Sequence, residues 1–181
     1  MDIKFENGAE GSQPLPEFLW EVHSYINEYI RFADVKAAFV VVIATGLLGA
    51  LVTSSLYRPL FQSSAEGPAR SVWIAVGAII LLGASLICSI IAVKPRLTGK
   101  WHHGFIFWES IAGFESGGKY WHEVKSLSTE DRARAIAEHL YALSGVARAK
   151  YKWVNLAILS LICGAIPAAI LLFVEHALKT V

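Results

Sequence analysis

The chain has 181 residues, of which 55% are hydrophobic and 17% charged, and its formal net charge is +1. Its apolar residues gather in three runs, 37–57, 71–93 and 153–174, that contain no Asp, Glu, Lys, Arg or His. A helix of about 20 apolar residues crosses the core of a bilayer. The sequence therefore predicts an all-α integral membrane protein with three transmembrane helices, and it leaves no room for a large catalytic or sensing domain.

The N-terminal part is expected to form a disordered segment, 1–15, followed by one long helix, 16–57. The first 16 residues are polar and acidic and show no cleavable signal peptide, so we expect the first span to be an uncleaved anchor. Pro16-Glu17 is typical of a helix start. We expect half of this helix to stand in the cytoplasm as an amphipathic stalk that buries one apolar stripe. The stripe comprises Phe18, Val22, Tyr25, Ile26, Tyr29, Phe32 and Ala33.

Residues 58–70 are expected to form a short external loop before the second transmembrane helix, 71–93. The two cysteines, Cys88 and Cys163, lie inside apolar runs, and we interpret them as packing residues rather than a disulfide. Small residues form ridges that let helices approach closely, within the chain or between protomers of an expected homo-oligomer. These ridges are Thr45, Gly49 and Thr53 in the first run and Ser160, Gly164 and Ala168 in the third.

Residues 94–128 are expected to form a small cytoplasmic segment rich in aromatic residues. Seven of the 21 aromatic residues in the chain fall within 101–121. Such a segment suits a flat, anionic ligand, because aromatic rings stack on a nucleobase and cationic groups hold a phosphate. The candidate ligand-binding residues are Arg96 and Lys119 for the phosphate, and Trp101, Phe107, Trp108 and Trp121 for the base.

Other interpretations of this segment stay open. Aromatic residues beside a span often lie in the interfacial belt, and nearby basic residues often contact lipid headgroups. His102 and His103, with His122 and Glu109 or Glu123, could bind a metal, but their spacing fits no known motif. A small membrane-bound hydrolase that uses His102, His103 and Glu109 is a further alternative, and we expect neither a metal site nor a catalytic site. Gly117-Gly118-Lys119 lacks the GxxxxGK[ST] pattern of a phosphate loop and is interpreted as a turn.

The last predicted helix, 129–174, again joins a cytoplasmic stalk to a span, and 175–181 form an external tail. Ser128 and Asp131 have the spacing of a capping box. The apolar stripe expected on this stalk comprises Ala133, Ile136, Ala137, Leu140, Ser144, Ala147 and Tyr151.

Three charged residues near the membrane surface are candidates for coupling the cytoplasmic part to the spans. Asp34 and Lys36 lie just before the first span, and Lys94 follows the second. We expect the first two to act through charge complementarity with 94–100.

The distribution of charge predicts the orientation of the chain. Residues 94–152 contain ten of the 16 basic residues and carry +4, whereas 1–36 carry −4. Lys and Arg near the spans stay on the cytoplasmic side. The N-terminus and 94–152 are therefore expected in the cytoplasm, and 58–70 and the C-terminus outside.

Several short motifs resemble those of a known family. Ala-Asp-Val-Lys-Ala at 33–37 precedes the first span, Lys-Pro-Arg at 94–96 follows the second, and Gly-Phe-Ile-Phe-Trp at 104–108 lies in the loop with Tyr120. Their order resembles that of the small transmembrane effectors of the Pycsar bacterial anti-phage systems, over roughly residues 20–174. The resemblance implies that a partner cyclase makes cyclic CMP or cyclic UMP on infection. It also implies that this protein, which would not be an enzyme, binds the nucleotide and then impairs the inner membrane before phage matures.

A structural or adaptor protein is the main alternative from another functional class. Its stalks would recruit a cytoplasmic protein partner instead of a nucleotide. We expect no nucleic-acid partner in either case.

The predicted orientation can be tested with reporter fusions. Fusions after Val181 should give periplasmic signals, and fusions within 98–125 cytoplasmic signals, because of the Lys and Arg distribution. The reverse pattern would place the aromatic segment outside, where a nucleotide made in the cytoplasm does not reach it.

Overall fold

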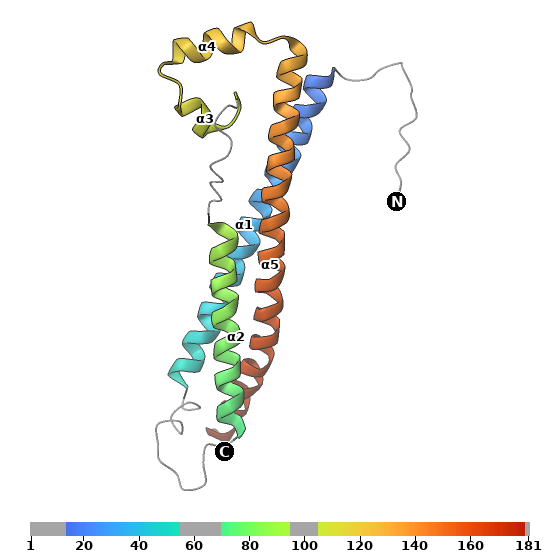
Figure 1. Ribbon diagram of the computed structural model, residues 1–181. Coiled ribbons are helices and arrows are strands. Elements are labelled where there is room, and N and C mark those ends of the chain that lie inside the picture. Colours follow the sequence, from blue (N-terminus) through green and yellow to red (C-terminus); the bar gives the residue numbers. More distant parts are fainter. Residues whose placement is uncertain (1–13, 55–69, 95–104, 180–181) are drawn as a thin grey trace, which may run out of the picture. The chain divides into compact units, whose positions relative to one another are not determined.

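The computed structural model describes residues 14–54, 70–94 and 105–179, and all the secondary structure within these ranges is helical. The helices are α1 (Leu15–Thr53), α2 (Arg70–Val93), α3 (Trp108–Ala112), α4 (Gly117–Ser126) and α5 (Thr129–Lys179) (Figure 1). By length and composition, α1, α2 and α5 could each cross a membrane. The prediction of an all-helical chain with three bilayer-length apolar helices is confirmed.

Two of these helices extend far beyond their apolar runs, as predicted. α1 has 39 residues and α5 has 51, each without interruption. Pro167 lies inside α5, where its missing N–H removes one backbone hydrogen bond without ending the helix. Most of the predicted segment 1–15 and of the loop 58–70 lies outside the described residues, as do 95–104 and the last two residues of the tail.

A capping box at Ser128 sets the start of α5. The Ser128 hydroxyl accepts a hydrogen bond from the Asp131 backbone N–H at 3.1 Å, and the Ser128 N–H lies 3.4 Å from the Asp131 carboxylate. The box gives partners to backbone donors that the first turn of a helix leaves unpaired. The predicted capping box is confirmed.

The interpretation of Gly117-Gly118-Lys119 as a turn is wrong. These residues form the first turn of α4, which Ser116 caps by accepting a hydrogen bond from the Lys119 backbone N–H at 3.2 Å. Glycine disfavours a helix by about 1 kcal/mol per residue, and a serine cap offsets part of that cost by satisfying an unpaired donor. The helix therefore begins at two glycines with the help of a cap that the residue pattern of a phosphate loop or a turn does not take into account.

The described residues form two structural units. The bundle unit contains residues 30–54, 70–94 and 147–179, and the aromatic unit contains 14–29 and 105–146. α1 and α5 contribute to both units, α2 belongs to the bundle unit, and α3 and α4 belong to the aromatic unit.

Small side chains are frequent in the core of the bundle unit. Ala44 of α1, Ala78 of α2 and Ala157 of α5 are almost completely buried there. Ser85 of α2 is also fully buried, and its hydroxyl donates a hydrogen bond to the Ala157 carbonyl oxygen at 2.8 Å. Both cysteines are free; Cys88 lies in this core, as its interpretation as a packing residue requires, whereas Cys163 is exposed.

The two small-residue ridges have different environments in the structure. A Cβ atom placed on Gly164 would lie 3.1 Å from Leu81 Cβ and from Leu82 Cγ, so this ridge packs against α2 within the chain. A Cβ atom on Gly49 would meet no atom within 4 Å. Of the two ridges, the one on α1 is therefore the one still available for contact between protomers.

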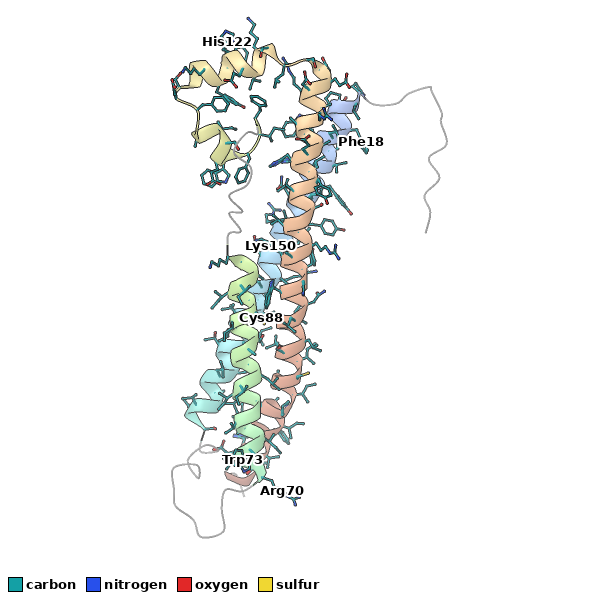
Figure 2. All side chains as sticks on the ribbon, in the orientation of Figure 1. Phe18, Arg70, Trp73, Cys88, His122 and Lys150 are labelled. Carbon is teal, nitrogen blue, oxygen red and sulfur yellow. The ribbon has the colours of Figure 1, made fainter. Side chains whose placement is uncertain are left out.

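The predicted apolar stripes are correct only in part. On α1, Ala33 is buried and Val22 and Ile26 are partly buried. The aromatic members are exposed; these are Phe18, which Figure 2 labels, and Tyr25, Tyr29 and Phe32. On α5, Ala137 and Ser144 are exposed. The apolar arc of each helix is wider than the face that packs, and helical periodicity does not say which edge of the arc meets a partner.

The two glycines offer a matched pair of variants. Gly164→Leu should lower the thermal unfolding temperature in detergent by several degrees, because overpacking a close helix contact costs about 1–3 kcal/mol. Gly49→Leu should leave that temperature unchanged and reduce assembly measured by native mass spectrometry. Loss of assembly at unchanged stability in Gly164→Leu would instead place that ridge between protomers.

Candidate functional site

A small aromatic core holds the segment between α2 and α5. The ring centroids of Phe105 and Phe114 are 6.3 Å apart, and those of Phe114 and Tyr120 are 5.3 Å apart. The Tyr120 hydroxyl donates a hydrogen bond to the Phe105 carbonyl oxygen at 2.9 Å. This contact ties α4 to the residues just before α3, and so it fixes the backbone that carries Phe107 and Trp108.

Five aromatic rings in the aromatic unit are connected one to the next by ring contacts, and we call this set the ring row. Its members are Trp20 and His23 of α1, His139 of α5, and Phe107 and Trp108 at the start of α3. The successive ring centroids are separated by 5.1, 5.4, 6.4 and 5.8 Å in the order Trp20, His23, His139, Phe107 and Trp108.

The ring row is accessible at both of its ends. Trp20 is 49% exposed and Trp108 is 62% exposed. An exposed indole ring presents a flat face on which a nucleobase can stack. The rings of the row come from three segments of the chain, and the two rings at its ends, Trp20 and Trp108, are exposed at the surface.

The predicted ligand residues do not gather at one place in the described part of the chain. Phe107 and Trp108 belong to the ring row. Trp121 lies on α4 and is 64% exposed. Lys119 forms an ion pair with Glu115 in which both side chains are largely exposed, so its charge is already partly compensated. Arg96 and Trp101 lie outside the described residues, as do His102 and His103.

Sequence reasoning missed three members of the ring row, namely Trp20, His23 and His139. The first two are three residues apart on α1, so they share one side of that helix. No local signal joins them to His139, which is more than 100 residues away in the chain and meets them only because α1 packs against α5 in this unit.

The environment of His139 favours its neutral form. Burial lowers the pKa of its imidazole, and the nearby charge of His23 lowers this pKa further. His23 has a second neighbour, because the Asn27 side-chain nitrogen lies 3.1 Å from its Nε2. Two facing imidazoles disfavour double protonation unless an anion binds beside them.

A buried ion pair joins α1 to α5 in the bundle unit. The Lys150 ammonium donates a hydrogen bond to the Asp34 carboxylate, and the Lys150 side chain is only 9% exposed whereas that of Asp34 is 39% exposed. Figure 2 labels Lys150 on α5. Burying an ammonium group is costly unless a carboxylate pairs with it, so this contact fixes how the two helices meet.

The other predicted coupling residues have weaker contacts. The Lys36 ammonium lies 5.5 Å from the centroid of the Tyr151 ring, at cation–π distance. Lys94 is exposed just after the end of α2. The segment predicted to complement Asp34, residues 94–100, lies mostly outside the described residues. In the structure Asp34 pairs with Lys150 instead, a residue for which the sequence analysis predicted no role.

Comparison with known proteins identifies the family. The family model described as the Pycsar effector protein domain, PycTM, matches residues 18–175. This chain belongs to the Pycsar effector family. The family match thus contains the whole of α2 and nearly all of α1 and α5, and it includes the ring row and the ion pair.

A curated relative supports this assignment. The chain is 28% identical over 135 residues to the Pycsar effector protein SaPycTM of Staphylococcus aureus, and the match covers 75% of this chain and 80% of the relative. No solved structure matches the chain significantly. The resemblance that the sequence motifs indicated is therefore confirmed.

The buried ion pair can be tested by stability measurements. Asp34→Asn should lower the free energy of unfolding in detergent by about 1–3 kcal/mol, because a nearly buried ammonium loses its carboxylate. The double variant Asp34→Leu with Lys150→Met should recover most of this loss, since an apolar pair of similar size removes the buried charge.

The matched control is Glu138→Gln, which removes the ion pair with Arg134 on the exposed side of α5. It should leave the unfolding temperature nearly unchanged, because exposed pairs contribute little. If Asp34→Asn and Glu138→Gln have equal unfolding temperatures, the Asp34–Lys150 pair does not stabilise the protein, and another contact must compensate the buried Lys150 ammonium.

Proposed function

We propose that this protein binds a cyclic pyrimidine mononucleotide, cyclic CMP or cyclic UMP, through the aromatic unit and then impairs the bacterial inner membrane. The nucleotide comes from a partner cyclase that responds to phage infection, and the protein is an effector rather than an enzyme. Membership of the Pycsar effector family and three apolar helices of bilayer length support this function.

The ring row supports the choice of ligand site within the aromatic unit. A base stacked on an aromatic ring gains about 1–3 kcal/mol, and Trp108 offers an exposed ring that Phe107 supports from one side. Lys119 suits the phosphate less well, because Glu115 already compensates part of its charge. Arg96, Trp101 and Trp121 stay predicted ligand residues.

The observation that carries the proposal is that the two units share the helices α1 and α5. The same two helices, α1 and α5, supply rings to the ring row and residues to the apolar bundle, and neither helix is interrupted. A ligand changes a conformational equilibrium only through different affinities for two states. Nucleotide binding that favours a different packing of α1 against α5 would act on the bundle through these continuous helices.

In this proposal Asp34 is the main coupling residue, and it acts through Lys150. The ion pair lies between α1 and α5, so a change in their packing stretches or breaks a buried charged contact. Lys36 and Lys94 add charge at the same membrane surface. The aromatic unit lies in the cytoplasm, the C-terminus lies outside, and protomers associate in the bilayer to make the lesion.

Leakage from proteoliposomes tests the proposed function directly. Vesicles that contain the purified protein and a fluorescent dye should release the dye when micromolar cyclic CMP or cyclic UMP is added, and cyclic AMP should release none. A flexible Gly-Ser insertion at residue 35 or 152 should abolish leakage and keep nucleotide binding, because it separates the two parts of a continuous helix.

Variants in the two candidate ligand positions locate the site. Trp108→Ala should weaken nucleotide binding about tenfold through the loss of one stacked ring. Weakening by Trp121→Ala alone would move the site to α4. If wild-type protein neither binds a pyrimidine nucleotide nor releases dye, the adaptor function replaces the effector function.

A further inference from the structure

Two histidines occupy the centre of the ring row and have no role in the function proposed so far. His23 of α1 and His139 of α5 face each other with ring centroids 5.4 Å apart and planes inclined by 30°. His139 also faces Phe107, and His23 also faces Trp20, so an aromatic ring flanks the imidazole pair on each side.

The nitrogen atoms of this pair are available to a ligand. Within the described residues neither ring nitrogen of His139 has a hydrogen-bond partner, and His23 has only the Asn27 side chain. No ion pair joins either imidazole to a carboxylate in that part of the chain. No buried side-chain nitrogen or oxygen atom there lacks a hydrogen-bond partner, so the unbonded His139 nitrogens are accessible to solvent.

An anion is the ligand class that suits two neighbouring imidazoles. Each protonated imidazole donates charge-assisted hydrogen bonds and carries a positive charge. Their mutual repulsion opposes double protonation, and an anion beside both rings removes that opposition. A metal ion is less suited, because no group of three or more His, Cys, Asp or Glu side chains that could hold one occurs among the described residues.

We propose that His23 and His139 hold the cyclic phosphate of the nucleotide, while its base stacks on the neighbouring rings of Phe107 and Trp108. This inference rests on the proposed function, because it assigns the anionic part of the same ligand. The phosphate and the base of a mononucleotide lie on opposite sides of the ribose. One ligand can therefore place its phosphate at the imidazoles and its base one ring further along the row.

Proton uptake follows from this assignment. In the free protein the pKa of His139 is lowered by burial and by His23. The bound anion raises the pKa of the His139 imidazole, so binding takes up a proton between the free and the bound pKa values. The cyclic phosphate keeps one negative charge throughout this range. Affinity should thus increase as the pH falls from about 8 to about 6, where histidine titrates.

Among the described residues, the charged groups near the imidazole pair do not account for such a response. His23 is the group whose charge acts on His139. The other ring that contacts His139 is that of Phe107, which carries no titratable group. The carboxylates within two residues of these positions are Glu21, Glu109 and Glu138; all three are exposed, and Glu138 pairs with Arg134.

Calorimetry of the full-length protein in detergent tests the assignment with cyclic CMP and cyclic UMP as probes. Titrations at several pH values, each in two buffers of different ionisation enthalpy, give the affinity and the number of protons taken up. Wild-type protein should bind more tightly at lower pH, by up to about tenfold per pH unit for one linked proton.

Three histidine variants sharpen the measurement. His139→Gln and His23→Gln should each weaken binding about tenfold or more, since a charge-assisted hydrogen bond is lost, and should reduce proton uptake. His122→Gln is the matched control, because His122 is exposed on α4 (Figure 2) and is not a member of the ring row, and this variant should bind like the wild type. Circular dichroism verifies that each variant is folded.

The outcomes separate this inference from the function on which it rests. Wild-type binding that is independent of pH, or unchanged affinity in a folded His139→Gln variant, would overturn the histidine assignment and leave the nucleotide effector intact. Absence of wild-type binding at every pH would overturn both. The wild-type titrations decide the question even if both histidine variants fail to fold.

Discussion

Close contact between helices with small side chains is the constraint on which the bundle unit depends. Lipid tails are as apolar as leucine, so helices in a bilayer associate through close packing and polar contacts rather than through the hydrophobic effect. Ala33, Ala37 and Ala92 are almost completely buried in one cluster, and Ser85 bonds directly to the backbone of α5. The same close approach lets the short Asp34 side chain reach Lys150 from the neighbouring helix, so the ion pair is a consequence of the packing as well as a support for it.

Local signals made the helices predictable, and contacts between distant residues limited the rest. The capping box at Ser128 and the absence of breakers before each span were sufficient to predict α1 and α5. Lys150 was not recognised as buried, because a lysine in an amphipathic stretch normally faces water, and its burial depends on a carboxylate 116 positions earlier. Tyr25 and Tyr29 were placed in a buried stripe by their spacing, but they are exposed and bond to each other across one turn.

The residues of the candidate site also differ in whether the local sequence makes them predictable. Phe107 and Trp108 could be selected from the sequence because aromatic residues are concentrated around them. Their ring neighbours on α1 and α5 could not, because each is a single residue on a long helix. The two features that matter for function also differ physically: the ring row is open at its ends and so accessible to a ligand, whereas the ion pair is largely enclosed and so sensitive to small displacements of the helices around it.

The unbroken course of α1 and α5 also has an evolutionary consequence. A helix that makes contacts in two units cannot gain or lose one residue between them without turning one set of contacts by about 100° around its axis. The stretches around residues 30 and 147, where both helices pass from one unit to the other, should therefore tolerate substitutions far better than insertions or deletions. Changes in chain length among family members should collect in the connections between helices, and the spacing from His23 to Asp34 and from His139 to Lys150, which is 11 residues in both helices, should stay fixed.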